Sequence, residues 1–231
     1  MGRVEKVALV TGASRGLGRA LACALADRGW RLVIDARGAG ELEAARAELA
    51  GQTVVTALAG DVADDEHRRT LVAAALELGG LDRLVNNASA LGPSPQPRLA
   101  DYPLETLAHV YRVNVLAPLA LVQLALPPLE RSHGRILTVT SDAAVEGYEG
   151  WGGYGSSKAA LEQLTNVLAA EHPLLRVYWV DPGDMNARMQ QEAFPGEDVS
   201  DRPPPEASVP GLLVLVEDER PSGRYRAREL A

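Results

Sequence analysis

The chain of 231 residues is poor in cysteine, in lysine and in long apolar runs. Its single cysteine, Cys23, cannot form an internal disulfide, and its place among alanines and leucines favours a small core residue. The longest apolar stretch, residues 113–129, contains Asn114, Gln123 and three prolines, so it does not read as a membrane span. No N-terminal signal peptide is visible, because strand-like sequence begins almost at once. These absences favour a cytoplasmic protein without a membrane partner.

An excess of positive charge is also missing. The formal net charge of −8 argues against a general binder of nucleic acid or of membrane surfaces. Only Lys6 and Lys158 are lysines, so Lys158 is conspicuous in a chain whose other basic residues are arginine. None of the four scattered histidines pairs with acids at ligand spacing, and we therefore expect no metal site.

Apolar, β-branched runs alternate with alanine- and leucine-rich stretches of helical spacing. This alternation predicts one α/β domain over residues 1–231, with a doubly wound parallel sheet and helices on both faces. The expected strands are 4–10, 31–36, 53–59, 81–86, 135–140, 175–180 and 223–227. The expected helices are 16–28, 39–50, 64–78, 103–117, 118–131, 151–171 and 206–217.

Three glycines, Gly12, Gly16 and Gly18, follow the first expected strand and open the first expected helix. Glycines allow a tight turn close to a phosphate, and the helix N-terminus offers free N–H groups. The order of strand, glycine turn and helix favours a site for a pyrophosphate over an ordinary strand-to-helix turn.

Tyr154 and Lys158 lie four residues apart in a stretch expected to be helical, so they share one face. A neighbouring ammonium favours the phenolate and lowers the pKa of a tyrosine, which makes the pair a proton donor and acceptor near neutrality. Ser141 closes a strand-like run, where its hydroxyl could hold a substrate oxygen. Asn114, a poor helix former, falls within an expected helix and implies a bound water or a backbone kink. Each residue alone also suits a cap, the core or a solvated face.

Together, Asn114, Ser141, Tyr154 and Lys158 resemble the catalytic tetrad of the short-chain dehydrogenase/reductase family. Further segments match that family in order: Thr11–Gly18, Asp61-Val62, Asn86-Asn87-Ala88-Ser89 with serine for the last glycine, and Pro182-Gly183. The resemblance implies a Rossmann-type sheet of seven strands. It also implies hydride transfer between a nicotinamide cofactor and a small carbonyl or alcohol substrate, with Tyr154 as the general acid or base.

The same resemblance gives the cofactor-binding residues, apart from Tyr154 and Lys158. They are Gly12, Ser14, Arg15, Gly16, Leu17, Gly18, Arg37, Asp61, Val62, Asn87, Ala88, Pro182 and Gly183. NAD-selecting enzymes need an acid after the second strand, where this chain has Ala36. Arg15 and Arg37 instead favour NADP(H) over NAD(H), although Asp35 would repel a 2′-phosphate if it faced the ribose.

The chain departs from the family pattern after Pro182-Gly183, where Ala187 replaces a threonine that contacts the nicotinamide; Asn186 could substitute for it. Residues 185–210 form a long irregular stretch at the ligand side, which we expect to be a substrate loop. The nearby acids could bind a polar substrate, but solvation is the simpler interpretation; they are Asp142, Glu146, Glu149 and Asp184. The arginines of 220–228 suggest the polar face of an edge strand.

Two other classes compete with the enzyme. One is a nucleotide-binding regulator or scaffold without turnover, which has no need of a lysine-activated tyrosine. The other is a Rossmann-like methyltransferase, which Tyr154, Lys158 and the Asn86–Ser89 segment disfavour. Helices 118–131 and 151–171 are apolar on more than one face, which suits either burial within the monomer or a contact between subunits. The family resemblance, in which these helices form the four-helix contact of a dimer, implies a homodimer or homotetramer.

Overall fold

The computed structural model describes residues 5–230. Its core is one seven-stranded sheet in the order β3-β2-β1-β4-β5-β6-β7, and every neighbouring pair is parallel. The strands are β1 (Val7–Val10), β2 (Arg31–Ala36), β3 (Val55–Ala59), β4 (Arg83–Asn86), β5 (Arg135–Val139), β6 (Arg176–Asp181) and β7 (Gly223–Arg226). The predicted fold class is confirmed. The first strand is shorter than expected and begins at Val7; residue 4 lies outside the described residues.

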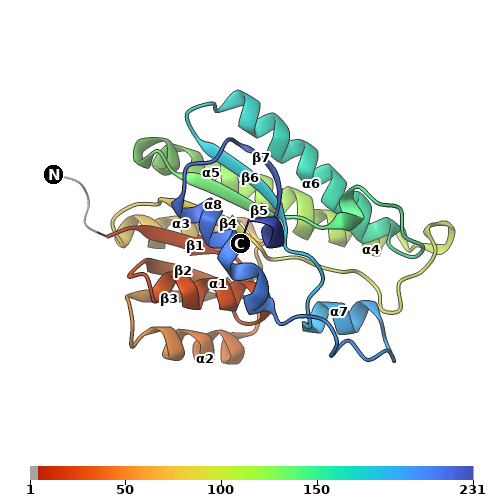
Figure 1. Cartoon of the computed structure of the whole chain (residues 1–231). Coiled ribbons are helices and arrows are strands. Elements are labelled where there is room, and N and C mark those ends of the chain that lie inside the picture. The colour runs from red at the N-terminus through yellow and green to blue at the C-terminus, as the bar shows by residue number, and fades with distance from the viewer. Residues whose placement is uncertain (1–4, 231) are drawn as a thin grey trace.

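Helices cover both faces of this sheet (Figure 1). They are α1 (Gly16–Ala26), α2 (Ala39–Leu49), α3 (Asp65–Glu77), α4 (Leu104–Tyr111), α5 (Ala117–Ser132), α6 (Gly152–Glu171), α7 (Arg188–Ala193) and α8 (Val209–Glu217). One apolar cluster joins the sheet to α1, α2 and α8, and a second joins it to α3, α5 and the end of α6. Successive residues of β1 alternate between the two clusters, as a strand buried on both faces requires.

The two helices expected at 103–117 and 118–131 are one continuous helix, so the predicted break is wrong. A π-helical turn, Arg112–Leu116, joins α4 directly to α5. Pro118 follows this turn, and its missing N–H falls where the regular hydrogen-bond ladder is already interrupted. The combined helix is long and apolar enough to cross a membrane by those criteria alone, yet 56% of its most apolar stretch is buried inside the protein.

The expected substrate loop, 185–210, is only partly irregular. It contains α7 and a 3₁₀ turn, Pro205–Ser208, which leads into α8. Figure 1 shows α7 set apart from the sheet, beyond the carboxyl ends of the strands. This segment therefore supplies one wall of whatever lies at those strand ends.

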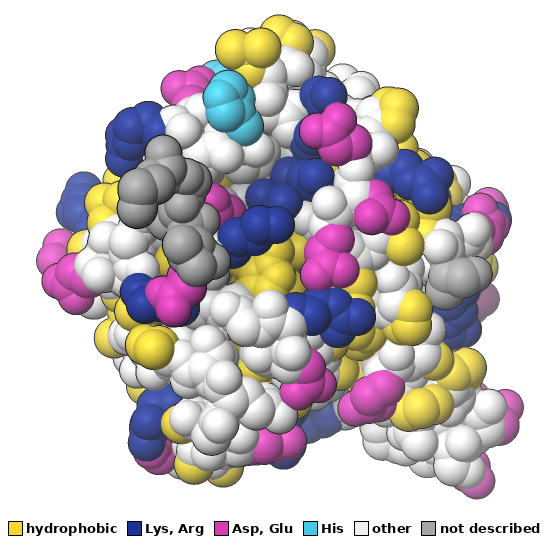
Figure 2. All heavy atoms as spheres, turned by 60° about the vertical axis from the view of Figure 1, so that its left-hand side comes forward, with side chains coloured by type: hydrophobic (Ala, Val, Ile, Leu, Met, Phe, Trp, Pro, Cys, Tyr) yellow, Lys and Arg dark blue, Asp and Glu magenta, His cyan; other side chains and the backbone are white. Residues whose placement is uncertain are grey.

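The opposite end of the sheet is held by charged side chains. Arg28 pairs with Glu217 at 3.3 Å, and Arg31 pairs with Glu5. Two buried arginines, Arg83 and Arg135, donate to carbonyl groups at the end of α8. On the face shown in Figure 2, basic and acidic side chains are interspersed. These four arginines therefore have structural partners.

Candidate active site

A cavity of about 1650 Å³ opens at the carboxyl ends of the strands, where β1 lies between β2 and β4 and the strand order reverses. Fifteen of the seventeen predicted site residues line it, and the other two lie directly behind its wall. Gly18 packs against the glycine turn, where an added Cβ would meet the carbonyl oxygen of Gly12 at 2.4 Å. Asn114 is completely buried. The fold thus gathers the whole predicted set in one place.

The glycine turn is fixed by backbone contacts. Gly12 has a φ of +66°, and an added Cβ would lie 2.9 Å from the Cα of Ala88, so both its conformation and its surroundings require glycine. The side-chain amide of Asn87 donates to the carbonyls of Thr11 and Gly12 at 2.8 and 3.1 Å. The Thr11 hydroxyl accepts from the backbone N–H groups of Asn87 and Ala88, both at 3.0 Å. Asn87 therefore braces the turn that a ligand would contact.

Asp35 lies at one end of this cavity but does not face it freely. Its side chain is buried, and one oxygen accepts from the N–H of Gly12 at 2.8 Å. The other lies 3.2 Å from Nε2 of His67. Arg15 and Arg37 are both exposed at the rim, and Arg15 pairs with Glu41 at 2.9 Å. The acid is thus occupied internally, whereas the two guanidinium groups lie at the surface of the pocket.

The other end of the cavity holds the side chains of Ser141, Tyr154 and Lys158. Tyr154 and Lys158 lie on one face of α6, and the Lys158 ammonium is 5.6 Å from the centre of the Tyr154 ring. The same ammonium donates to the carbonyl of Val139 at 2.8 Å. Ser141 follows β5, and its hydroxyl donates to Oδ1 of Asp142 at 2.9 Å.

Asn114 holds this end together from behind. It sits in the π-helical turn, which is the backbone irregularity that the sequence led us to expect there. Its side-chain nitrogen donates to the carbonyl of Ala90 and to the hydroxyl of Ser157, both at 2.9 Å. Its Oδ1 accepts from the N–H of Ala90 at 2.7 Å. The turn thus joins the long helix, α6 and the segment after β4.

Burial controls the ionisation of the tyrosine and the lysine. It raises the pKa of Tyr154 well above its ordinary value; Asp142 and Asp181 raise it further, whereas hydrogen bonds with Ser89 and Ser141 lower it. Burial lowers the pKa of Lys158 to about 8, and the charge of Glu162 opposes that change. The expected lowering of the tyrosine pKa is therefore wrong, because desolvation dominates the pKa of this buried hydroxyl.

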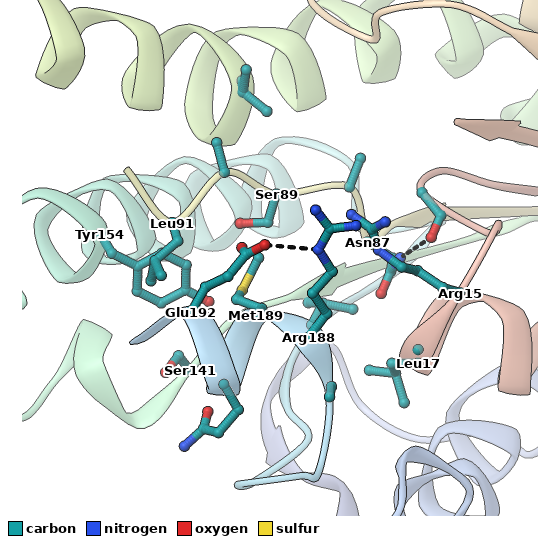
Figure 3. Close-up of a pocket in the computed structure, with 18 of the residues that line it drawn as sticks. Arg15, Leu17, Asn87, Ser89, Leu91, Ser141, Tyr154, Arg188, Met189 and Glu192 are labelled. Carbon is teal, nitrogen blue, oxygen red and sulfur yellow. Dashed lines mark hydrogen bonds and ion pairs between the residues drawn. The ribbon is translucent and has the colours of Figure 1, made fainter. Parts of the chain in front are cut away.

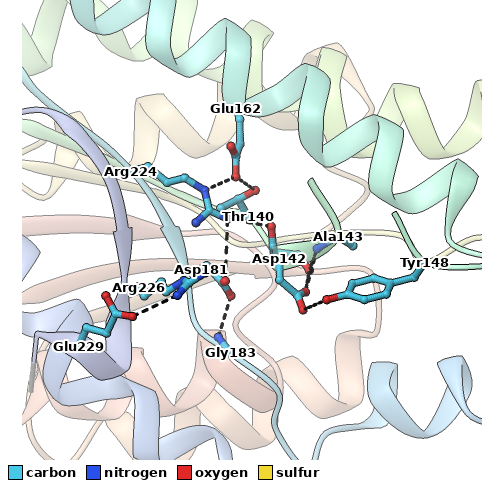
Figure 4. Close-up of polar contacts among 11 residues, drawn as sticks. Thr140, Asp142, Ala143, Tyr148, Glu162, Asp181, Gly183, Arg224, Arg226 and Glu229 are labelled. Atoms are coloured by element: carbon cyan, nitrogen blue, oxygen red, sulfur yellow. Dashed lines mark hydrogen bonds and ion pairs between the residues drawn. The ribbon is translucent and has the colours of Figure 1, made fainter. Parts of the chain in front are cut away.

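A polar network that the sequence did not reveal underlies Ser141 (Figure 4). Arg224 of β7 donates from Nε to Glu162 at 3.0 Å and from Nη2 to the carbonyl of Ser141 at 3.1 Å. It also lies 3.9 Å from the buried Asp181. The expected edge strand is confirmed, because β7 ends the sheet and carries Arg224 and Arg226. Arg228 lies beyond the strand in a 3₁₀ turn, and Arg224 binds the network instead of facing solvent.

The wall opposite this network comes from α7 and an aromatic cluster. Trp151 lies edge-on to Tyr154, with ring centres 5.7 Å apart. The centres of the Trp151 and Phe194 rings are 5.9 Å apart. Figure 3 shows Arg188 pointing toward Arg15 and Asn87, and Met189 pointing toward Tyr154. The backbone N–H of Asn186 donates to the carbonyl of Pro203 at 2.8 Å.

Among residues 5–230, no group of three histidines, cysteines or acids could hold a metal ion.

Comparison with known proteins agrees with this arrangement. Residues 6–198 match the short chain dehydrogenase family. The chain is 36% identical over 172 residues to the short chain dehydrogenase penD of Penicillium thymicola, across 71% of this chain and 62% of that protein. The chain thus covers less than two thirds of that relative's length. It is 35% identical over 201 residues to sepiapterin reductase of Mus musculus, across 81% of this chain and 77% of the relative.

A solved structure shares the whole architecture. An alcohol dehydrogenase from the archaeon Thermococcus sibiricus, complexed with 5-hydroxy-NADP, superposes with a TM-score of 0.85 at 31% identity. The superposition covers 96% of this chain and 95% of that one. The sequence match, the parallel seven-stranded sheet and the site at its carboxyl end agree, and the chain belongs to the short-chain dehydrogenase/reductase family of oxidoreductases.

Proposed function

We propose that this protein transfers a hydride between NADP(H) and a small carbonyl or alcohol substrate, with Tyr154 as the general acid or base. The observation that carries the proposal is the meeting of Ser141, Tyr154 and Lys158 in the same cavity as the glycine turn. A cofactor held by that turn and a substrate beside the tyrosine would then lie next to one another. A nucleotide-binding regulator has no use for this second group of residues.

The cavity suits a dinucleotide by shape. Gly12 and Gly18 leave backbone space that any Cβ would fill, and α1 begins at Gly16 with its N-terminus toward the cavity. The volume of about 1650 Å³ exceeds the roughly 300–1,000 Å³ of pockets for one small ligand. It has room for both a dinucleotide and a small substrate. Ser14, Leu17, Asp61, Val62, Ala88, Pro182 and Gly183 line the same cavity and would complete the binding surface.

NADP(H) is favoured over NAD(H) by the charges at the rim. Arg15 and Arg37 offer guanidinium groups to a 2′-phosphate. Asp35 would favour NAD, but its two carboxylate oxygens already have hydrogen-bond partners in the N–H of Gly12 and the ring of His67. The Thermococcus alcohol dehydrogenase was solved with a derivative of NADP, which supports the same choice.

The proposed proton transfer follows from the pKa directions. Nicotinamide chemistry supplies or removes a hydride at the substrate carbon when the cofactor is bound. In the reductive direction, Tyr154 gives its proton to the substrate oxygen, and its raised pKa keeps it protonated at neutral pH. Lys158 is charged below its pKa of about 8 and stabilises the resulting phenolate. Ser141 stabilises the substrate oxygen after its hydroxyl turns away from Asp142.

Substrate choice is assigned to the segment 185–210, because α7 and the aromatic cluster of Trp151 and Phe194 lie beside Tyr154. A homodimer or homotetramer is also part of the proposal. Two large apolar side chains are exposed at or beside the helices expected to make that contact: Val167 lies on α6, and Leu116 lies in the π-helical turn directly before α5. The net charge of −8 supports a small molecule, not a nucleic acid, as the partner.

The proposed function is tested by following NADPH consumption with a panel of aldehydes and ketones. We expect turnover with at least one carbonyl, and weaker binding of NADH than of NADPH. A protein that binds NADPH without turning over any carbonyl or alcohol would be the non-catalytic alternative. Binding of S-adenosylmethionine in place of NADPH would indicate the methyltransferase.

A further inference from the structure

Ser89 occupies the position at which the family's Asn-Asn-Ala-Gly segment has glycine. It follows β4 and projects into the pocket near Tyr154 (Figure 3). Its hydroxyl donates to Oδ1 of Asn114 at 3.2 Å and lies close enough to the Tyr154 hydroxyl to lower the pKa of that tyrosine. A glycine here would give neither contact, so this chain has a hydroxyl beside the proposed acid that the family pattern lacks.

Asn114 gives this hydroxyl a fixed neighbour. The Asn114 amide is anchored by three other hydrogen bonds, to the N–H and carbonyl of Ala90 and to Ser157. It therefore stays in place whether or not Ser89 donates to it. The Ser89 hydroxyl has a single proton, which can be given either to Asn114 or to Tyr154.

We propose that Ser89 is a further catalytic residue, which donates its hydrogen bond to Asn114 while Tyr154 is neutral and to the Tyr154 phenolate after proton transfer. The inference rests on the proposed function. In the reductive direction, the Tyr154 O–H bond breaks and its proton bonds to the substrate oxygen, while NADPH supplies the hydride to the carbon. Ser89 keeps its own proton throughout and only turns it from Asn114 to the phenolate oxygen.

Ser89 suits this role better than Ser141. The Ser141 hydroxyl donates to the carboxylate of Asp142 at 2.9 Å, whereas Ser89 donates to a neutral amide. Carboxylates hold hydrogen-bond donors more strongly than amides do, so Ser89 gives up its acceptor more easily. This division leaves Ser141 for the substrate oxygen and Ser89 for the tyrosine.

Other charges also face Tyr154 and remain in every variant below. Asp142 after β5 and Asp181 of β6 raise its pKa, and the Lys158 ammonium of α6 lies 5.6 Å from the centre of its ring. The ion pair of Arg188 and Glu192 on α7 lies at the same wall. Because these groups are unchanged, a difference between variants at position 89 reports the hydroxyl itself.

The test measures alcohol oxidation with NADP⁺, where Tyr154 acts as the base. The positive charge of the bound nicotinamide opposes the desolvation that raises the tyrosine pKa, so kcat rises with pH through an apparent pKa of this complex. A hydrogen bond to a charged group shifts the pKa of that group by about one unit or more. We expect Ser89→Ala and Ser89→Gly to move the midpoint upward by about one unit and to lower kcat about tenfold below it. Ser89→Thr, which keeps a hydroxyl, should restore the wild-type midpoint. Ser156→Ala, on the exposed side of α6, is the matched control.

The outcomes separate the two proposals. A lower kcat with an unshifted midpoint in both Ser89→Ala and Ser89→Gly would make Ser89 merely structural and overturn the inference, as would an unchanged kcat. A wild-type protein that oxidises no alcohol and reduces no carbonyl would instead contradict the proposed function. The dissociation constant for NADP⁺, measured in each variant, should stay within about twofold if the change lies at Tyr154.

Discussion

The two ends of the pocket are built in different ways. At the cofactor end, backbone groups and short motifs shape the surface: Gly12 leaves space for a ligand, and Asn87 holds the turn. At the substrate end, side chains from distant parts of the chain meet. Arg224 is 62 residues from Glu162 and 83 from Ser141, and it binds both. A site formed by one turn can be predicted from one stretch of sequence. A network of distant residues cannot, because its members meet only after folding.

The largest effect is expected at Tyr154, where a substitution should lower turnover but leave cofactor binding nearly unchanged. Tyr154→Phe removes the proposed acid and leaves the glycine turn intact, so turnover should fall by about 10²–10⁴-fold. The dissociation constant for NADPH should change by no more than about threefold, since the remaining contacts are kept. Single-turnover kinetics and a fluorescence titration of NADPH check the two values. If the variant keeps more than about a tenth of the wild-type chemical rate, Tyr154 is not the acid.

At Arg15 and Arg37 we expect the opposite result, in which NADPH binding weakens and kcat persists. Hydrogen bonds to charged groups contribute roughly 1.5–3 kcal/mol each, so changing both arginines to alanine should weaken NADPH binding by about a hundredfold or more. NADH binding should change far less, and kcat at saturating NADPH should persist. Arg19→Ala, an exposed arginine of α1 paired with Glu48, is the matched control. Equal losses for both cofactors, or a wild type that prefers NADH, would contradict the assignment.

A smaller effect is expected from the network beneath Ser141. Arg224→Met releases the Ser141 carbonyl and leaves Glu162 and Asp181 without their shared cation. We expect kcat to fall about tenfold, because misplacing a proposed catalytic group costs rate before it costs binding. Arg226→Met serves as the control, since Arg226 lies on the same strand and pairs with the exposed Glu229. A wild-type kcat in Arg224→Met would show that the network does not position Ser141.

The smallest expected effect is a pH dependence set by Lys158. Burial lowers its pKa to about 8, so the ammonium is present below that pH and is lost above it. Between pH 7 and pH 9 the charged fraction of Lys158 falls about tenfold. Because the neutral amine still donates a hydrogen bond, we expect carbonyl reduction at saturating NADPH to fall by about fivefold. Lys158→Arg keeps its charge over this range, and its pH profile should lack the step. A wild-type rate that stays constant through pH 8 would contradict a role for this charge.

Much of this molecule could be predicted from sequence because its signals are local. The alternation of strand-like and helical periodicity predicted the parallel sheet. The spacing of Gly12, Gly16 and Gly18 predicted the position of the glycine turn. Tyr154 and Lys158 share a face of α6 as one helical turn requires. In each case the information lies within a few residues of chain, where periodicity and backbone conformation are decided.

The features that sequence did not give depend on packing. The continuous helix through Asn114 needs the π-helical turn, which contacts α6 and the segment after β4. The raised pKa of Tyr154 comes from desolvation in the folded pocket and not from its neighbours in the chain. Arg224 was visible only as part of an arginine-rich end. Its partners after β5, in β6 and in α6 adjoin it only because β7 pairs with β6.

Hydride transfer itself tests the central claim most directly. Wild-type protein would be incubated with a reactive carbonyl and NADPH carrying deuterium at one of the two C4 positions, and then with the other form. We predict that one of the two labels appears on the carbinol carbon of the product alcohol, and that Tyr154→Phe forms almost no labelled product. An alcohol product without deuterium from either form, or a protein that forms no alcohol while NADPH stays bound, would contradict the account.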